Sequence, residues 1–299
     1  MAPKILLPGH TLSILFKLIF YNLLGQFSEI KKASFSGNIS DLTNPDKLII
    51  VLVGHATVFI NFYGTTILTD PVFGGYFPGF ARFVEPGLKI DQLPFLDYVL
   101  ISHAHFDHLN RKSLRQLSTK TKTLVIPKND LDLVSDLGFS KIVELDWKMD
   151  LKETNLAITA FKPTHWGSRY PWERIQRGYN SYILTKRNTT ILFAGDTAYN
   201  DNFKKIARKH PIDVALLPIG AYDPPFFQRF HLSPHDAIKV FEEIEAKYFI
   251  PIHWGAFRLS LEGLEEPPGV LRHLMRGKGL QDNLKLLYPG QHFERPYPQ

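Results

Sequence analysis

The chain has 299 residues, 44% of them hydrophobic and 21% charged, which describes a folded globular protein and excludes a largely disordered or low-complexity chain. The formal net charge of +6 gives a mild positive field, which is too general to identify an anionic partner. The absence of cysteine excludes disulfides, thiolate zinc sites, iron–sulfur clusters and cysteine nucleophiles, so any metal ion must be held by imidazole and carboxylate groups.

An apolar run opens the chain, from Leu12 to Leu24, with Ser13 and Lys17 on a thin polar stripe at helical spacing. It is shorter than the roughly 20 residues that span a bilayer. No small-x-small cleavage site follows, which favours a retained helix over a secretory signal. The helix either lies on a membrane surface or packs on the protein's own core, and its lysines favour the membrane. We therefore predict a segment, residues 1–40, that is a candidate for membrane contact, and a hydrolase domain, 41–299, in a cytoplasmic protein with peripheral membrane association.

Short β-type runs alternate with helical segments through the rest of the chain. Strands are predicted at Leu48–Val53, Thr57–Phe62, Thr66–Thr69, Asp97–Ser102, Thr123–Pro127, Ala157–Phe161, Ser181–Leu184, Thr190–Ala194, Val214–Pro218 and Tyr248–Ile252. A helix-like stretch covers Ser113–Leu117, and a longer helix is predicted over Pro234–Ala246. No Pro/Gly/Ser-rich linker separates the two halves, so they are predicted to form one domain.

The strongest chemical signal is the segment His103-Ala104-His105-Phe106-Asp107-His108, which directly follows a predicted strand. A loop there can turn four potential metal ligands toward one point. The alternative is a polar surface loop, but such a loop rarely carries three histidines and an aspartate at this spacing. Four ligands from so tight a turn cannot all reach one ion without strain, whereas two ions about 3.5–4 Å apart could divide them.

Three more candidate ligands follow other predicted strands: His165, Asp196 and His253. Each is a weak signal alone, because a single histidine after a strand is more often a hydrogen-bonded core residue and Gly-Asp is usually a turn. Only the presence of the dense histidine segment favours metal binding at these positions.

The order of these motifs, His-x-His-x-Asp-His, then His, Gly-Asp and His, resembles the metallo-β-lactamase superfamily. The resemblance implies an α/β (α+β layered) fold, the αββα sandwich, with two zinc ions as the default cofactors. It further implies that one ion is held by His103, His105 and His165, the other by Asp107, His108 and His253, and that Asp196 bridges both. Asp70, in Leu68-Thr69-Asp70-Pro71, matches a motif whose aspartate orients the metal-binding histidines without touching metal.

Within the superfamily, the chain from about Val53 to Glu266 most resembles the N-acyl phosphatidylethanolamine-hydrolysing phospholipases D and their bacterial relatives. The segments that carry this resemblance are Gly54-His55-Ala56-Thr57, Glu144-Leu145-Asp146-Trp147, Gly195-Asp196-Thr197-Ala198-Tyr199, Pro218-Ile219-Gly220-Ala221-Tyr222-Asp223-Pro224 and Ile252-His253-Trp254-Gly255. It implies hydrolysis of a phospholipid phosphodiester to phosphatidic acid and an N-acylethanolamine by a hydroxide that the two metal ions activate.

Two residues are candidates for catalysis beyond the metals. Asp107 is expected to act there as well as to bind an ion, and His231 matches a histidine that the family places near the metals, as a general acid or a phosphate contact. The alternative for His231 is a surface histidine just before a helix start. Tyr222, Phe226 and Phe227 are candidates for a groove that takes acyl chains, although core aromatics are the commoner fate.

Other functions stay open at this point. The same residues could hydrolyse a soluble substrate such as a lactone or a cyclic nucleotide, and a non-catalytic metal- or lipid-binding protein is a further alternative. The expected partners are a phospholipid substrate and a membrane surface; no nucleic acid is expected, because no long basic run is present. A homodimer, the native metal and the acyl-chain preference are left undecided.

Overall fold

The computed structural model describes residues 17–18, 20–23, 30–77, 79–153, 155–170 and 172–296. Most of the predicted N-terminal helix lies outside these residues, but residues 17–18 and 20–23 are helical. In that short part Leu18 and Asn22 are buried, while Phe20 and Leu23 are half exposed. No helix within the described ranges is long and apolar enough to cross a membrane.

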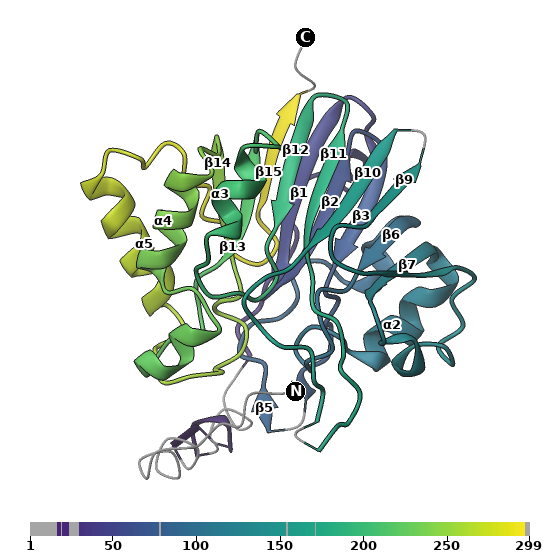
Figure 1. The fold of residues 1–299 in the computed structure, drawn as a ribbon, viewed down its shortest axis with the longest axis horizontal. Coiled ribbons are helices and arrows are strands. Elements are labelled where there is room, and N and C mark those ends of the chain that lie inside the picture. The colour runs from purple at the N-terminus through teal and green to yellow at the C-terminus, as the bar shows by residue number, and fades with distance from the viewer. Residues whose placement is uncertain are drawn as a thin grey trace.

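A seven-stranded sheet forms the first half of the structure (Figure 1). Its strand order is β15 (His292–Pro296), β1 (Lys47–Gly54), β2 (Thr57–Phe62), β3 (Thr65–Thr69), β6 (Leu96–Leu100), β7 (Thr121–Pro127) and β8 (Ile142–Leu145). Strands β1 to β3 form the predicted antiparallel meander, and β3, β6, β7 and β8 are parallel. The strand β15, near the C-terminal end, pairs with β1 and forms one edge of this sheet.

A six-stranded sheet forms the second half. Its order is β14 (Tyr248–Ile252), β13 (Val214–Pro218), β12 (Thr189–Phe193), β11 (Ser181–Lys186), β10 (Leu156–Phe161) and β9 (Asp150–Glu153). The first three of these are parallel and the others antiparallel. A separate two-stranded hairpin consists of β4 (Tyr76–Phe77) and β5 (Phe80–Ala81).

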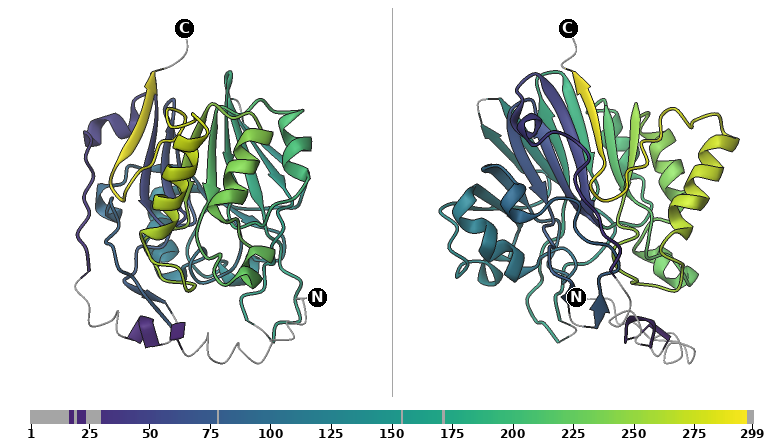
Figure 2. Two further views of the ribbon diagram at one scale, coloured as in Figure 1. Left: turned by 90° about the vertical axis from the view of Figure 1, so that its left-hand side faces the viewer. Right: turned by 180° about the vertical axis from the view of Figure 1, so that it is seen from behind.

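The two sheets lie face to face, with α2 on one flank and α3, α4 and α5 grouped on the other (Figures 1 and 2). The helices are α2 (Arg111–Leu117), α3 (Asn202–Ala207), α4 (Pro234–Glu243) and α5 (Glu266–Gly277), and short 3₁₀ helices are η1 (Ile39–Thr43), η2 (Ile90–Gln92), η3 (Ser118–Lys120), η4 (Leu131–Leu133) and η5 (Pro225–Arg229). This arrangement is the predicted αββα sandwich.

Strand β1 shows how the sequence produces four layers. Its side chains point alternately to the two faces of the sheet. Leu48, Ile50 and Leu52 join the apolar core between the sheets, which also takes in side chains of α4 and α5. Ile49 and Val51 join the second core, on the side of α2. Strands that are apolar on both faces therefore require covering layers on both sides.

Most predicted elements are present, with three kinds of difference. The helix predicted to reach Ala246 ends at Glu243, because Glu245 adopts a left-handed backbone with φ of 50°. The helix-like stretch at Ser113 begins earlier, at Arg111, because the side chain of Asn110 caps it by accepting a hydrogen bond from the Ser113 amide at 2.9 Å. Helices α3 and α5 and strands β4, β5, β8, β9 and β15 were not predicted.

Candidate metal centre

The predicted ligands converge at one edge of the sandwich, where several strands end. His103 follows β6, His165 follows β10, Asp196 follows β12 and His253 follows β14. Gly195 lets the loop after β12 lie close to Ser102, because a Cβ at position 195 would be only 2.8 Å from the Cβ of Ser102. The structure thus brings together side chains that are up to 150 residues apart in the sequence.

We call His103, His105 and His165 the three-histidine cluster. The Nε2 of His103 lies 2.7 Å from the Nδ1 of His105, and the Nε2 of His165 lies 3.3 Å from the same Nδ1. Three nitrogens directed at one point in this way can share a cation between them.

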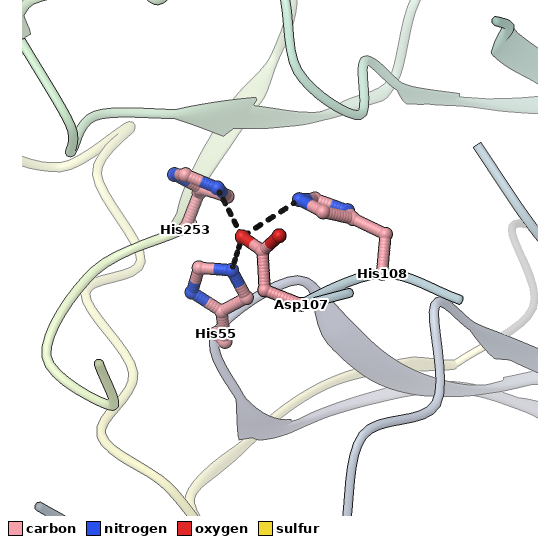
Figure 3. A group of neighbouring side chains, drawn as sticks. All are labelled: His55, Asp107, His108 and His253. Carbon is pink, nitrogen blue, oxygen red and sulfur yellow. Dashed lines mark hydrogen bonds and ion pairs between the residues drawn. The ribbon is translucent and has the colours of Figure 1, made fainter. Parts of the chain in front are cut away.

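We call Asp107, His108 and His253 the Asp107 cluster (Figure 3). The Oδ2 of Asp107 lies 3.4 Å from the Nε2 of His108 and 3.5 Å from the Nε2 of His253. A fourth side chain, His55, places its Nε2 2.9 Å from the same oxygen. The resemblance segment Gly54-His55-Ala56-Thr57 contained this histidine, but no role was predicted for it.

Asp196 lies between the two clusters. Its Oδ1 is 3.1 Å from the Nε2 of His253, and its Oδ2 is 3.3 Å from the Nε2 of His108. The same Oδ2 lies 3.9 Å from His103 Nε2 and 3.8 Å from His165 Nε2. This is the placement that a bridging carboxylate requires.

Asp70 orients one histidine of each cluster. Its Oδ2 lies 2.7 Å from the Nδ1 of His108, which directs the Nε2 of that ring at Asp196. The hydroxyl of Ser102 donates to Asp70 Oδ2 at 2.6 Å and lies 2.9 Å from the Nδ1 of His103. Because that hydroxyl gives its hydrogen to Asp70, it accepts one from His103 Nδ1. Asp70 therefore contacts His108 directly and His103 through Ser102, which sequence reasoning missed.

Burial and neighbouring charges shift the pKa values of the histidines in opposite directions in the two clusters. Burial lowers the pKa of His105 to about 4 and holds the pKa values of His103 and His165 well below the usual range. Burial also opposes charge on His253, but Asp196 and Asp107 raise its pKa to about 9. Three neutral rings therefore face a cluster in which a histidine is protonated at neutral pH.

The donor set fits divalent metal ions. Among the described residues, buried atoms that lack a hydrogen-bond partner include His108 Nε2, His253 Nε2 and Asp196 Oδ1, all directed into the same space. Buried polar atoms are rarely left without partners. The groups that converge here include imidazole nitrogens and carboxylate oxygens, which are ligands that zinc accepts.

The remaining predicted site residues lie in the segment from Tyr222 to His231. His231 places its Nε2 3.4 Å from Asp196 Oδ2, on the side of the three-histidine cluster. Phe226 and Phe227 are half-buried in η5, and the ring centroid of Phe227 lies 6.5 Å from that of His231. The hydroxyl of Tyr222 donates to Glu266 of α5 at 2.9 Å, so this end of Tyr222 is turned toward that helix.

Comparison with known proteins identifies the family. A family model described as a β-lactamase superfamily domain matches residues 65–254. N-acyl-phosphatidylethanolamine-hydrolyzing phospholipase D 1 of Caenorhabditis elegans is 29% identical over 255 residues, covering 79% of this chain and 72% of that protein. The mitochondrial enzyme of the same name in Saccharomyces cerevisiae is 32% identical over 244 residues, covering 77% of this chain and 52% of that protein. This chain therefore spans about half the length of the yeast protein.

The fold agrees with this result. A solved metallo hydrolase from the archaeon Ignicoccus hospitalis superposes with a TM-score of 0.66 at 18% identity, over 84% of this chain and 100% of that one. The likeness to this structure concerns the fold alone. Family model, relatives, fold and the His/Asp cluster agree, and the chain belongs to the metallo-β-lactamase superfamily as a metal-dependent hydrolase.

Proposed function

We propose that this chain hydrolyses the phosphodiester bond of N-acyl phosphatidylethanolamine and releases phosphatidic acid and an N-acylethanolamine. The observation that carries the proposal is the convergence of two ligand clusters on Asp196, in a chain 29% and 32% identical to phospholipases that the names of those relatives assign to this substrate. A phosphodiester suits such a site, because two positive centres can face both the attacking and the leaving oxygen.

The ligand assignment follows the two clusters. We assign one zinc ion to the three-histidine cluster and the other to the Asp107 cluster, with Asp196 shared between them. When bound, the two ions would lower the pKa of a water between them toward about 7 and polarise a phosphoryl oxygen. The side chains of this protein fix where that water and the phosphate lie.

Asp107 acts in this proposal as a ligand and as an acceptor for the attacking water. Burial would raise its pKa, but His108 and the other nearby imidazoles hold the pKa of Asp107 well below its usual range. The carboxylate is therefore ionised at neutral pH and can accept a hydrogen bond from water, orienting it toward phosphorus.

His231 is proposed to protonate the leaving oxygen of the N-acylethanolamine. Its Nδ1 lies 3.3 Å from the backbone oxygen of Phe227, which can accept a hydrogen bond from this nitrogen. In the imidazolium form Nδ1–H keeps that contact, and Nε2–H, on the side of Asp196, donates its proton to the leaving group, which leaves a neutral ring. Phe226 and Phe227, next to His231, are proposed to contact the acyl chains, and Tyr222 to border the same groove.

The expected partner is a membrane that contains the substrate. We propose that the protein works at the cytoplasmic face of a membrane and that exposed apolar side chains of the N-terminal segment, such as Phe20 and Leu23, contribute to contact. Co-sedimentation with phospholipid vesicles tests this contact. Light scattering coupled to gel filtration tests whether the chain forms a homodimer.

The experiment that tests the function combines metal analysis with four substrates. The purified protein is assayed for bound metals, then incubated with vesicles of N-acyl phosphatidylethanolamine, vesicles of phosphatidylethanolamine, a lactone and a cyclic nucleotide. We expect about two ions per chain and metal-dependent release of phosphatidic acid from the first substrate only. Turnover of only the lactone or the nucleotide would contradict the phospholipase proposal and leave the metal site standing.

A further inference from the structure

His55 occupies a backbone position that residues other than glycine seldom take. It lies in the tight turn between β1 and β2 and has φ of 61°, in the left-handed region. Two other site residues share this feature: Asp70 has φ of 36° and His253 has φ of 61°. Strained backbone at a buried polar cluster points to a requirement for the particular side chain.

The surroundings of His55 hold its ring in one orientation. The side chain is buried, and its ring lies 4.1 Å from the ring of His253 and edge-on to Phe257 at 5.2 Å, measured between centroids. Its backbone oxygen accepts a hydrogen bond from the amide of His253 at 3.0 Å. His55 thus contacts His253 through both its backbone and its ring, and Asp107 through its ring.

The contact with Asp107 decides which ring nitrogen carries the hydrogen. Nε2 lies 2.9 Å from Asp107 Oδ2, and an ionised carboxylate can only accept, so Nε2 must donate. Nδ1 has no hydrogen-bond partner among the residues that the structure describes. In the tautomer that carries its hydrogen on Nε2, Nδ1 is only an unused acceptor. In the other tautomer a buried N–H would lack an acceptor, which costs about 1–3 kcal/mol.

We propose that His55 is a positioning residue that orients Asp107 for metal binding and does not itself bind metal. Its Nε2–H occupies one lone pair of Asp107 Oδ2 and leaves another directed toward His108 and His253. This inference rests on the proposed metal binding by the Asp107 cluster. It assigns His55, in the turn between β1 and β2, a role in the affinity of the Asp107 cluster for its ion and none in that of the three-histidine cluster.

Three variants separate the hydrogen bond from the backbone requirement. His55→Leu keeps an apolar volume and removes the donor. His55→Gln places an amide N–H near the position of the ring Nε2. His55→Asn suits the left-handed backbone but is too short to reach Asp107. His273→Leu, at an exposed histidine on α5, is the matched control.

Zinc affinity is measured by competition with a fluorescent chelator, zinc content by mass spectrometry, and folding of the metal-free proteins by circular dichroism. We expect wild type and the His273 variant to bind two ions. His55→Leu and His55→Asn should bind one of the two about 10–100-fold more weakly, and His55→Gln should recover most of the loss.

The proposal is overturned if folded His55→Leu binds both ions as tightly as wild type. It is also overturned if folded His55→Gln is as defective as His55→Leu, because a residue that binds metal through its ring is not replaced by an amide. Wild type that lacks a second ion contradicts it too. Two ions without phospholipid turnover contradict the proposed function alone.

Discussion

The three-histidine cluster and the Asp107 cluster lie on opposite sides of Asp196 and are prepared in opposite ways. In the first, burial dominates: the pKa of His105 is lowered to about 4 and its ring is neutral. In the second, Asp196 and Asp107 outweigh burial, and the pKa of His253 rises to about 9. The same residue type is thus neutral or protonated according to whether the carboxylates are in direct contact with its ring, as they are with His253.

Each cluster also has an additional histidine beside it. His231 lies near Asp196 and His165 and is 8% exposed. His55 contacts Asp107 and is 1% exposed. Slight exposure suits proton transfer to a substrate, whereas complete burial suits the orientation of a ligand. The two sides of the site are therefore expected to respond differently to substitution and to pH.

The largest effect is expected where the two clusters meet. Asp196→Asn removes the charge that both share, so we expect turnover to fall by about 10³-fold or more and metal content to drop. Zinc analysis and phosphatidic acid release measure both. Asp201→Asn, at an exposed aspartate five residues away, is the control and should behave like wild type. Full metal content and activity in the Asp196 variant would contradict the bridging role.

His231→Gln should separate catalysis from metal binding on the side of the three-histidine cluster. If His231 donates the proton, kcat falls about 10²-fold or more while both ions remain bound. Assays with a substrate whose leaving group is an acidic phenol should show a much smaller loss, because that group needs no proton. An equal loss with both substrates argues against the role.

The pH dependence of zinc affinity should differ between the clusters. A metal ion must displace the proton of a histidine that binds it. A raised histidine pKa therefore weakens metal binding at every pH below that pKa. With the pKa of His253 at about 9 and that of His108 also held well above its usual range by nearby carboxylates, affinity of the Asp107 cluster should rise by about tenfold or more per pH unit from pH 6 to 9. With the pKa of His105 at about 4, affinity of the three-histidine cluster should be nearly constant over that range. Calorimetric titrations in buffers of different ionisation enthalpy count the protons released, and identical values for both ions would contradict this difference.

The smallest effect is expected from Ser102→Ala. The hydroxyl of Ser102 connects Asp70 to His103, whereas His108 keeps its own direct contact with Asp70. Affinity should therefore fall about tenfold at the three-histidine cluster and little at the Asp107 cluster. Chelator competition resolves the two ions, and equal weakening of both would show that Ser102 does not favour one cluster.

The ligand candidates could be predicted because each belongs to a local pattern. An apolar run followed by a polar residue places that residue at a strand end, and the dense segment from His103 to His108 makes the isolated histidines meaningful. His55 and Ser102 could not be found in this way. Each is a single polar residue next to a strand, and its role depends on partners such as Asp107, 52 residues from His55.

The unpredicted elements have similar explanations. Strand β15 is short and carries charged residues, and it pairs with β1 from the other end of the chain. Helix α5 begins at Glu266 with Pro267 and Pro268 in its first turn, where proline is tolerated although the same dipeptide suggests a break. In both cases tertiary contact outweighed a weak local preference.

The sequence by itself determined the layered fold, the absence of thiolate chemistry and the identity of the candidate ligands, because alternation of apolar residues and residue type are local properties. The division of these ligands around Asp196 came from the resemblance to the superfamily. Only the tertiary structure decided which rings are neutral and which protonated, and that the ring of His55 faces Asp107. Those properties depend on distance, burial and neighbouring charge, and the fold sets all three by joining strand ends that are far apart in the chain.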